Sequence, residues 1–277
     1  MNRFGKLLNF ELKRFVKIYF VLIGITIASQ IMGVISISRG YLKMANEEIY
    51  KQGVSMAEFI EWNGMMSMVK VIGSMWFMGP IALCVAALIF YIFLIWYRDW
   101  FGKNTFIYRL LMLPTARLNV FLAKATSIMM MVIGLVSIQL LLLPVESRIL
   151  KMIVPKDFRV DLPATEIISH SEYLQILIPQ SFIEFILYYG IGFMAVMILF
   201  TAILFERSYR VKGIVFGVLY SILAVCLFFL PMFVNESIAM NFFYPLEILL
   251  LETVMGLIII IGSILLSKFL LKSRVTV

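Results

Sequence analysis

Residues 214–234 read IVFGVLYSILAVCLFFLPMFV and carry no charged side chain. The hydrocarbon core of a bilayer is about 30 Å thick, so a helix needs roughly 20 apolar residues to cross it. A strand of a membrane β-barrel would instead alternate apolar and polar residues. The stretch therefore predicts a membrane-spanning helix.

Five other apolar runs have comparable length, and together the six predict an all-α, polytopic membrane protein. In chain order the predicted spans are residues 16–38, 71–97, 121–145, 182–205, 214–234 and 248–271. Of the 277 residues, 62% are hydrophobic and 14% are charged, whereas soluble domains have about 45–50% and 25%. One globule of this size cannot bury so much apolar surface, which excludes a soluble enzyme. We expect a single transmembrane domain over 1–277, with a kink at Pro80 and a helix end at Pro231.

Lys and Arg gather in alternate connections between these spans. The segments before span one, between spans two and three, between spans four and five, and after span six are basic, and the other three are neutral or acidic. Basic connections mark the cytoplasmic side of a membrane protein. We therefore expect both termini in the cytoplasm and the chain in the cytoplasmic membrane. Topology and anionic lipid then explain the net charge of +8 better than nucleic acid does.

The first 15 residues have a helical pattern of their own. Apolar residues recur at spacings of three or four from Phe4 to Phe15, while Lys6 and Lys13 lie off that stripe. This pattern predicts an amphipathic helix in the headgroup region, with its bases near anionic lipid. The alternative is a plain cytoplasmic extension of span one.

The predicted cytoplasmic loop between spans two and three mixes aromatic and basic residues. It includes Tyr97-Arg-Asp-Trp-Phe-Gly-Lys-Asn-Thr105 and Leu111-Met-Leu-Pro-Thr-Ala-Arg-Leu-Asn-Val-Phe-Leu-Ala-Lys124. Asn104 or Thr105 can cap a short helix that Pro114 ends. Aromatic residues and Arg dominate protein interfaces, so the loop predicts a short helix available to a partner. The alternative is an interfacial aromatic belt beside positive-inside charges.

The connection between spans five and six is apolar for a loop. Phe242, Phe243 and Tyr244 stand directly before Pro245. We expect short helices that dip back into the outer leaflet, which is allowed only where protein or water covers them. An aromatic belt at the outer interface is the alternative.

The sequence lacks the common motifs of catalysis and metal binding. The Walker pattern fails at Gly102-Lys103, because Asn104 follows and Tyr97 takes the place of the upstream glycine. No metal-binding or nucleophile motif occurs, and His170 is the one histidine. The spans are expected to lack the clustered polar groups of an intramembrane enzyme. No enzymatic activity and no cofactor are therefore expected in this chain.

Two acids lie inside the predicted spans, Glu184 in span four and Glu252 in span six. Each is within a few residues of the outer end, so they are expected to mark the outer interface. The functional alternative is an acidic ring that attracts a cationic substrate. Cys84 and Cys226 also lie in spans and are expected to be buried free thiols.

In topology and in its basic–aromatic loop, the chain resembles the permease subunit of an ABC-2-type ABC transporter, of the small kind found in Firmicutes-like bacteria. The resemblance covers the whole chain by topology and is densest in the two stretches quoted from the loop. It implies that the loop forms a coupling helix that docks on a separate ATPase, and that Phe242, Phe243 and Tyr244 lie at the outer gate. The implied docking residues are Asp99, Trp100, Phe101, Lys103, Phe106, Tyr108, Arg109 and Arg117.

The resemblance also implies a function. Such permeases are dimers of identical or paralogous copies, and the partner ATPases bind ATP and Mg²⁺. The expected activity is ATP-driven export of an apolar or amphipathic compound, such as a peptide, an antimicrobial or a lipid-like molecule. An ion-coupled secondary carrier and a non-transporting scaffold or sensor subunit are the alternatives.

Overall fold

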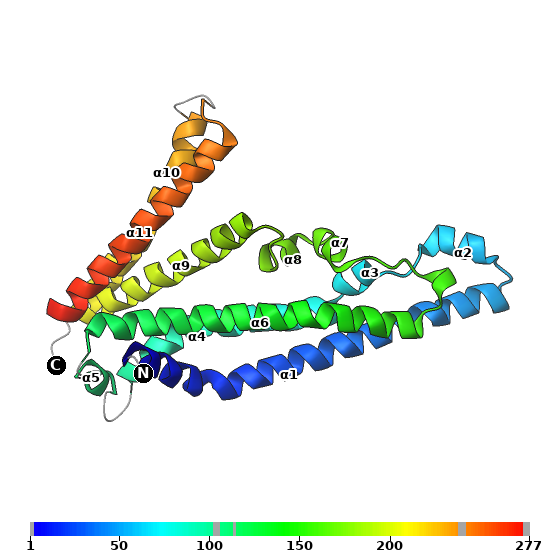
Figure 1. Ribbon diagram of the computed structural model, residues 1–277, viewed down its shortest axis with the longest axis horizontal. Helices are drawn as coiled ribbons and strands as arrows, with labels where there is room; N and C mark the ends of the chain where they lie inside the picture. Colours follow the sequence, from blue (N-terminus) through cyan, green and yellow to red (C-terminus); the bar gives the residue numbers. More distant parts are fainter. Residues whose placement is uncertain (1–2, 102–105, 113–114, 238–241, 274–277) are drawn as a thin grey trace. The chain divides into compact units, whose positions relative to one another are not determined.

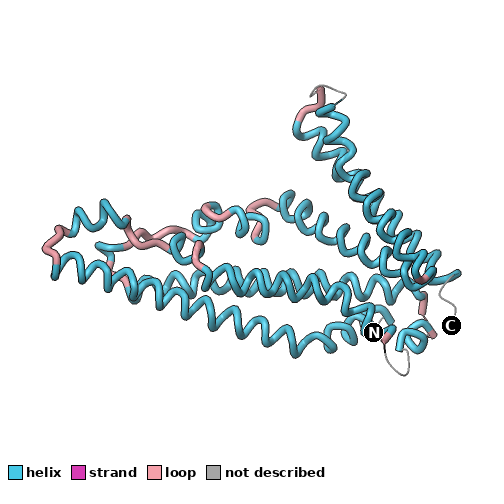
Figure 2. The backbone as a smooth tube through the Cα atoms, turned by 180° about the vertical axis from the view of Figure 1, so that it is seen from behind, coloured by secondary structure: helices cyan, strands magenta, loops and turns pink. Residues whose placement is uncertain are grey.

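The computed structural model describes residues 3–101, 106–112, 115–237 and 242–273. Among these residues the regular structure is helical, and extended pairing is confined to one isolated bridge between Met66 and Arg159 (Figures 1 and 2). Six of the described helices are long and apolar enough to cross a membrane. They are α1 (Arg3–Asn46), α4 (Met75–Trp100), α6 (Arg117–Ile153), α9 (Phe182–Tyr209), α10 (Val211–Ser237) and α11 (Pro245–Ser273). The predicted all-helical fold with six helices able to span a membrane is therefore confirmed.

Several of the helices are longer than the predicted spans. The helix α1 is continuous from Arg3 to Asn46, and the interfacial position of its first turns stays a prediction. A π-helical turn, Glu47–Lys51, follows it directly. The helix α6 runs through Pro144, and α10 runs through Pro231 to Ser237. The predicted helix end at Pro231 is therefore wrong, because one missing N–H removes a single hydrogen bond and membrane helices tolerate that loss.

The chain divides into two compact units. The first comprises residues 1–14, 88–130 and 182–277, and the second comprises residues 15–87 and 131–181. The helices α1, α4 and α6 each contribute to both units.

In the first unit, α9 packs closely against α10 through small residues. A Cβ atom added to Gly213 would lie 2.0 Å from the Phe205 carbonyl oxygen, and one added to Gly217 would lie 2.9 Å from that of Ala202. The two glycines are four residues apart and therefore share one face of α10, which is the spacing that lets membrane helices approach closely.

Hydroxyl groups connect α11 to the same pair of helices. The Tyr220 hydroxyl of α10 lies 2.6 Å from Ser263 Oγ, and Thr201 Oγ1 of α9 lies 3.0 Å from Ser267 Oγ. Both serines and Thr201 are fully buried. Interhelical hydrogen bonds of this kind hold membrane helices together where the hydrophobic effect supplies no force.

The second unit has its own apolar core. Five short helices surround the ends of α1 and α6: α2 (Met56–Asn63), α3 (Met68–Ile72), η2 (Lys156–Phe158), α7 (Ala164–Ser169) and α8 (Glu172–Leu177). Residues from both large connections are buried together here, with Phe59, Leu150 and Leu174 among them. The two connections, which appear ordinary in polarity, therefore fold into a packed body.

Both cysteines are free, as expected, but only Cys84 is buried. Cys226 is exposed on α10, so the expectation of two buried thiols is wrong for it. An exposed position on an apolar spanning helix needs only an apolar side chain, and free Cys behaves as a small hydrophobe.

Phe59 provides a test of this core. Its ring is fully buried and contacts Tyr41 and Phe158 edge-on, with centroid distances of 5.5 and 6.2 Å. We expect Phe59→Ala to destabilise the second unit by about 3–5 kcal/mol, because it leaves a cavity. The measurement is the thermal unfolding midpoint in detergent. Tyr50→Ala is the matched control, since Tyr50 is 82% exposed. Equal midpoints for the two variants would contradict the packed core.

Candidate functional site

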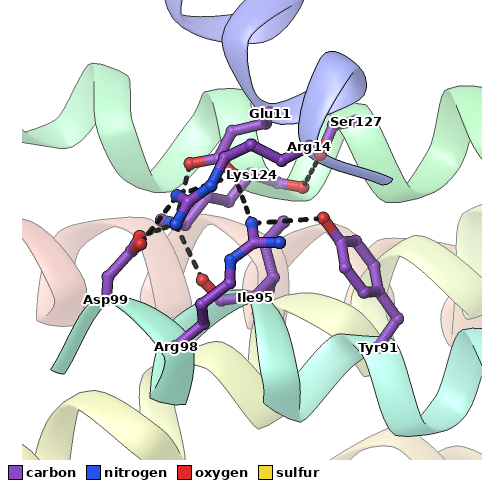
Figure 3. A network of polar contacts seen from close by, with 8 residues as sticks. All are labelled: Glu11, Arg14, Tyr91, Ile95, Arg98, Asp99, Lys124 and Ser127. Atoms are coloured by element: carbon purple, nitrogen blue, oxygen red, sulfur yellow. Dashed lines mark hydrogen bonds and ion pairs between the residues drawn. The ribbon is translucent and has the colours of Figure 1, made fainter. Parts of the chain in front are cut away.

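Five charged side chains converge in the first unit, where α1, α4 and α6 meet. Glu11 and Arg14 come from α1, Arg98 and Asp99 come from α4, and Lys124 comes from α6 (Figure 3). We call these five residues the charge cluster. Glu11, Asp99 and Lys124 are buried, with exposed fractions of 2%, 0% and 0%.

Lys124 is at the centre of the charge cluster. Its Nζ donates to Glu11 Oε1 at 2.8 Å, to the Ile95 carbonyl at 2.9 Å and to Asp99 Oδ2. An ammonium group has three N–H donors, so each of them has an acceptor. The same Nζ lies 5.3 Å from the centre of the Trp96 ring, a distance at which an aromatic face attracts a cation.

The two arginines of the charge cluster form the remaining ion pairs with Glu11 and Asp99. Arg14 Nη1 donates to Asp99 Oδ1 at 2.7 Å, and Arg98 Nη2 donates to Glu11 Oε2 at 3.4 Å. Each carboxylate therefore contacts Lys124 through one oxygen and an arginine through the other. The contacts run between helices far apart in the sequence, and they fix the positions of three helix ends relative to one another.

An aromatic cluster packs the same helices within the first unit. The ring of Trp96 on α4 meets that of Phe200 on α9 edge-on at 5.5 Å, and Phe121 on α6 meets Phe200 at 5.8 Å. All three side chains are fully buried. Water is excluded on this side of Lys124, so its ion pairs act in a medium of low dielectric constant.

The short helix α5 (Phe106–Leu111) is attached to the charge cluster. Its side chains Ile107, Leu110 and Leu111 are buried. The Phe106 ring stacks on Phe10 of α1 with a centroid distance of 5.7 Å. The Arg14 guanidinium lies 5.0 Å from the Phe10 ring and 5.4 Å from the Phe106 ring. The flat face of the Arg14 guanidinium thus contacts the Phe106 ring of α5, and one of its N–H groups donates a hydrogen bond to Asp99.

A groove of about 450 Å³ lies between the N-terminal turns of α1 and α5. Apolar side chains from both helices form most of its surface, and two bases of α1 border it. The lining residues are Arg3, Lys6, Leu7, Phe10, Phe106, Leu110 and Thr115.

The structure divides the predicted docking residues into surface and interior groups. Phe101 and Arg109 are exposed, the former by 69%. Asp99 is fully buried and paired, which does not support a surface role for it. Arg117 Nη1 donates to the Leu271 carbonyl at 2.6 Å and so caps the end of α11. Lys103 and the side chain of Tyr108 are outside the described part of the chain.

Trp100 and Phe101 have an intramolecular partner at the end of α9. The Arg207 guanidinium lies 4.6 Å from the Tyr97 ring, 5.1 Å from Phe101 and 5.7 Å from Trp100. These aromatic side chains therefore connect α4 to α9, and Phe101 still presents an exposed edge.

The predicted outer gate is described only in part. Phe242 and Tyr244 are exposed, by 78% and 74%. The Phe243 amide donates to Asn235 Oδ1 at 3.0 Å, and the Tyr244 amide donates to Glu247 Oε2 at 2.9 Å, which caps α11. Residues 238–241 lie outside the described residues, so the re-entrant segment stays a prediction.

Counting Lys and Arg only as markers of topology does not reveal the charge cluster. One signal was available: Glu11 and Asp99 are each the single acid in a strongly basic segment. A single acid among several bases at a helix end indicates a specific ion pair. Lys124 does not stand out in its own basic segment, and its partners come from other helices.

The second unit contains buried polar side chains that the sequence analysis did not expect. Gln30 Nε2 of α1 donates to Gln139 Oε1 of α6 at 3.0 Å. Ser38 and Glu146 are also fully buried. Glu146 lies inside a helix because α6 continues past Pro144. The expectation that the spans lack grouped polar side chains is therefore wrong for α1 and α6.

Over the described residues, no three His, Cys, Asp or Glu side chains lie close enough to hold a metal ion. The exposed His170 follows the last residue of α7, and its Nδ1 lies 2.7 Å from the Glu166 carbonyl oxygen. Comparison with protein-family models, with curated proteins and with solved structures finds no match.

Lys124→Met tests the charge cluster. The variant leaves Glu11 and Asp99 buried without their shared cation, and breaking a buried ion pair costs about 3–5 kcal/mol. We expect a clearly lower unfolding midpoint in detergent. Lys13→Met is the matched control, because Lys13 is exposed on the same helix as Glu11. If both variants unfold at the wild-type temperature, the charge cluster does not stabilise the first unit.

Proposed function

We propose that the chain is the membrane subunit of an ATP-driven exporter of apolar or amphipathic compounds, and that α5 receives a separate ATPase subunit. The observation that carries this proposal is the attachment of α5 to the charge cluster through Arg14. A short surface helix held this firmly by spanning helices is suited to transmit force. The family resemblance supports the same assignment.

The contacts define a route for the transmission. A displacement of α5 moves Phe106 against Phe10 and Arg14. Arg14 is bonded to Asp99, and Lys124 bonds Asp99 and Glu11 together, so the movement reaches α1, α4 and α6. The ATPase shifts the equilibrium between transport states only if it contacts α5 differently in its ATP-bound and ATP-free forms.

The exposed residues of this region favour a partner surface that combines acidic and apolar side chains. Arg109 and the bases Arg3 and Lys6 supply positive charge, and Phe101 and the α1–α5 groove supply apolar area. Opposite charge across an interface speeds association and selects the partner. In this proposal Asp99 positions the docking helix through Arg14, Arg117 caps α11, and neither residue contacts the ATPase.

The proposed assembly also includes nucleotide bound to the ATPase, a second permease copy and a defined membrane orientation. ATP and Mg²⁺ bind the partner ATPase, and a second permease copy or paralogue completes the translocation path. The protein lies in the cytoplasmic membrane with both termini inside, as the basic connections indicate. No enzymatic step is assigned to this chain.

An ion-coupled carrier is the second candidate function, and the buried Glu146 favours it. Glu146 lies in α6 one residue past the predicted span 121–145, and a buried ionisable residue on a spanning helix is a common element of proton pathways. Transport into vesicles with a proton gradient and no ATP separates the two candidates. Robust uptake under those conditions would overturn the exporter proposal.

Arg109→Glu tests the docking surface. Reversing an exposed charge is expected to weaken ATPase binding at least about tenfold, which corresponds to 1.4 kcal/mol. The measurement is the amount of a chain carrying a Walker motif that co-purifies with each variant from native membranes in mild detergent. Lys212→Glu is the matched control, because Lys212 is exposed and lies in another basic connection. Equal ATPase retention in both variants would contradict docking at α5.

Phe106→Ala tests transmission separately from docking. Without the ring, α5 loses its stacking contacts with Phe10 and Arg14, while Arg109 remains on the surface. We expect the ATPase to bind but substrate to stop stimulating ATP hydrolysis, as measured in reconstituted vesicles. Phe106→Tyr retains the ring and should retain the stimulation. Full stimulation in Phe106→Ala would show that the force follows another route.

A further inference from the structure

A second groove lies in the first unit between α9 and α11, with Phe228 of α10 contributing to its wall. Its volume is about 210 Å³. Most of the lining is apolar, and it includes Ile186, Ile191, Met194, Leu257 and Ile260. All three helices are long and apolar enough to span the membrane, so the walls of the groove belong to candidate membrane spans.

One acid interrupts this apolar lining. Glu252 is the eighth residue of α11, about 10 Å along the helix from Pro245 at a rise of 1.5 Å per residue. The side chain is half-buried. Within the described part of the chain it forms no hydrogen bond or ion pair, and the groove lining contains no Lys or Arg. A carboxylate placed in a membrane span is costly and therefore indicates a function.

Among the described residues, the Glu252 carboxylate is the one charged group in the groove lining. Thr253 Oγ1 donates its hydroxyl hydrogen to the Leu249 carbonyl of its own helix at 2.8 Å. Two aromatic side chains, Tyr188 and Phe228, also line the groove. Aromatic faces attract cations, and the attraction is stronger where water is absent. Charge and aromatic lining thus favour the same class of ligand.

We propose that this groove binds a lipophilic cation, with the Glu252 carboxylate as its counter-ion. A strongly hydrated cation would lose its water to an apolar wall without compensation. A neutral apolar molecule would leave the carboxylate unpaired. A cation that carries its own apolar surface satisfies both requirements. The identification of this ligand class as the exported substrate rests on the proposed function, whereas the binding itself does not.

Two glycines keep the groove open. Gly190 and Gly256 both line it. A Cβ atom at Gly190 would have no neighbour within 4 Å, so a larger side chain there occupies free space and does not clash. A Cβ atom at Gly256 would lie 3.7 Å from Met194 Sδ, which is ordinary contact. Gly190→Leu is therefore a variant that blocks the groove and leaves Glu252 in place.

The experiment uses two probes of the same shape and opposite charge, tetraphenylphosphonium and tetraphenylborate. The full chain is reconstituted without ATPase in phosphatidylcholine nanodiscs, and binding is measured by equilibrium dialysis against empty discs. We expect the wild-type protein to bind the cation at least about tenfold more tightly than the anion. Glu252→Gln should abolish this preference, and Glu252→Asp should retain most of it. Gly190→Leu should weaken binding of both probes.

Glu184→Gln is the matched control, because Glu184 is an acid of α9 that does not line the groove. It should bind both probes as the wild type does. The proposal is overturned if Glu252→Gln keeps the wild-type preference, if Glu184→Gln loses it, or if the folded wild-type protein binds neither probe. Since the discs contain no ATPase, such a failure would leave docking at α5 unaffected.

Discussion

The ammonium group of Lys124 is held where water is excluded, and the arrangement of the first unit depends on its three hydrogen bonds. Its two acidic partners come from different helices, and each acid also contacts an arginine. An isolated buried charge is strongly destabilising, whereas a fully bonded group of charges has one favourable arrangement. The ends of α1, α4 and α6 are thereby fixed in one register. Few other interactions have this specificity in a membrane, where apolar contacts between helices resemble contacts with lipid.

The position of α5 follows from this constraint. Three of its side chains are buried, and Phe106 lies against the same Arg14 that bonds Asp99. A surface helix attached only by apolar contacts could slide, because such contacts have little directionality. The guanidinium removes that freedom, since its hydrogen bond to a carboxylate and its contact with a ring both depend on orientation. The proposed docking surface is thus mechanically part of the spanning helices.

The α9–α11 groove has the opposite electrostatic character. At the charge cluster each acid has its cations within the chain, whereas Glu252 has none among the described residues. The charge cluster and the α9–α11 groove both hold ionised groups where solvation is poor. They differ in whether the chain itself supplies the opposite charge. An acid paired with a cation of the same chain holds helices rigidly together. An acid without such a partner can pair with a cationic ligand. This difference is the physical basis for assigning structure to one site and binding to the other.

The sequence alone determined the fold class, because uncharged runs such as 214–234 can be solvated only by lipid. It also located the aromatic and basic loop that contains α5, and it drew attention to Glu252. It could not show that Asp99 points inward, that α10 continues past Pro231, or that Glu11 and Lys124 meet. The Glu11–Lys124 pair, for example, joins side chains 113 residues apart in the chain. Local patterns record the preference of a segment for water or lipid, whereas the pairing of two buried charges is decided by how helices pack.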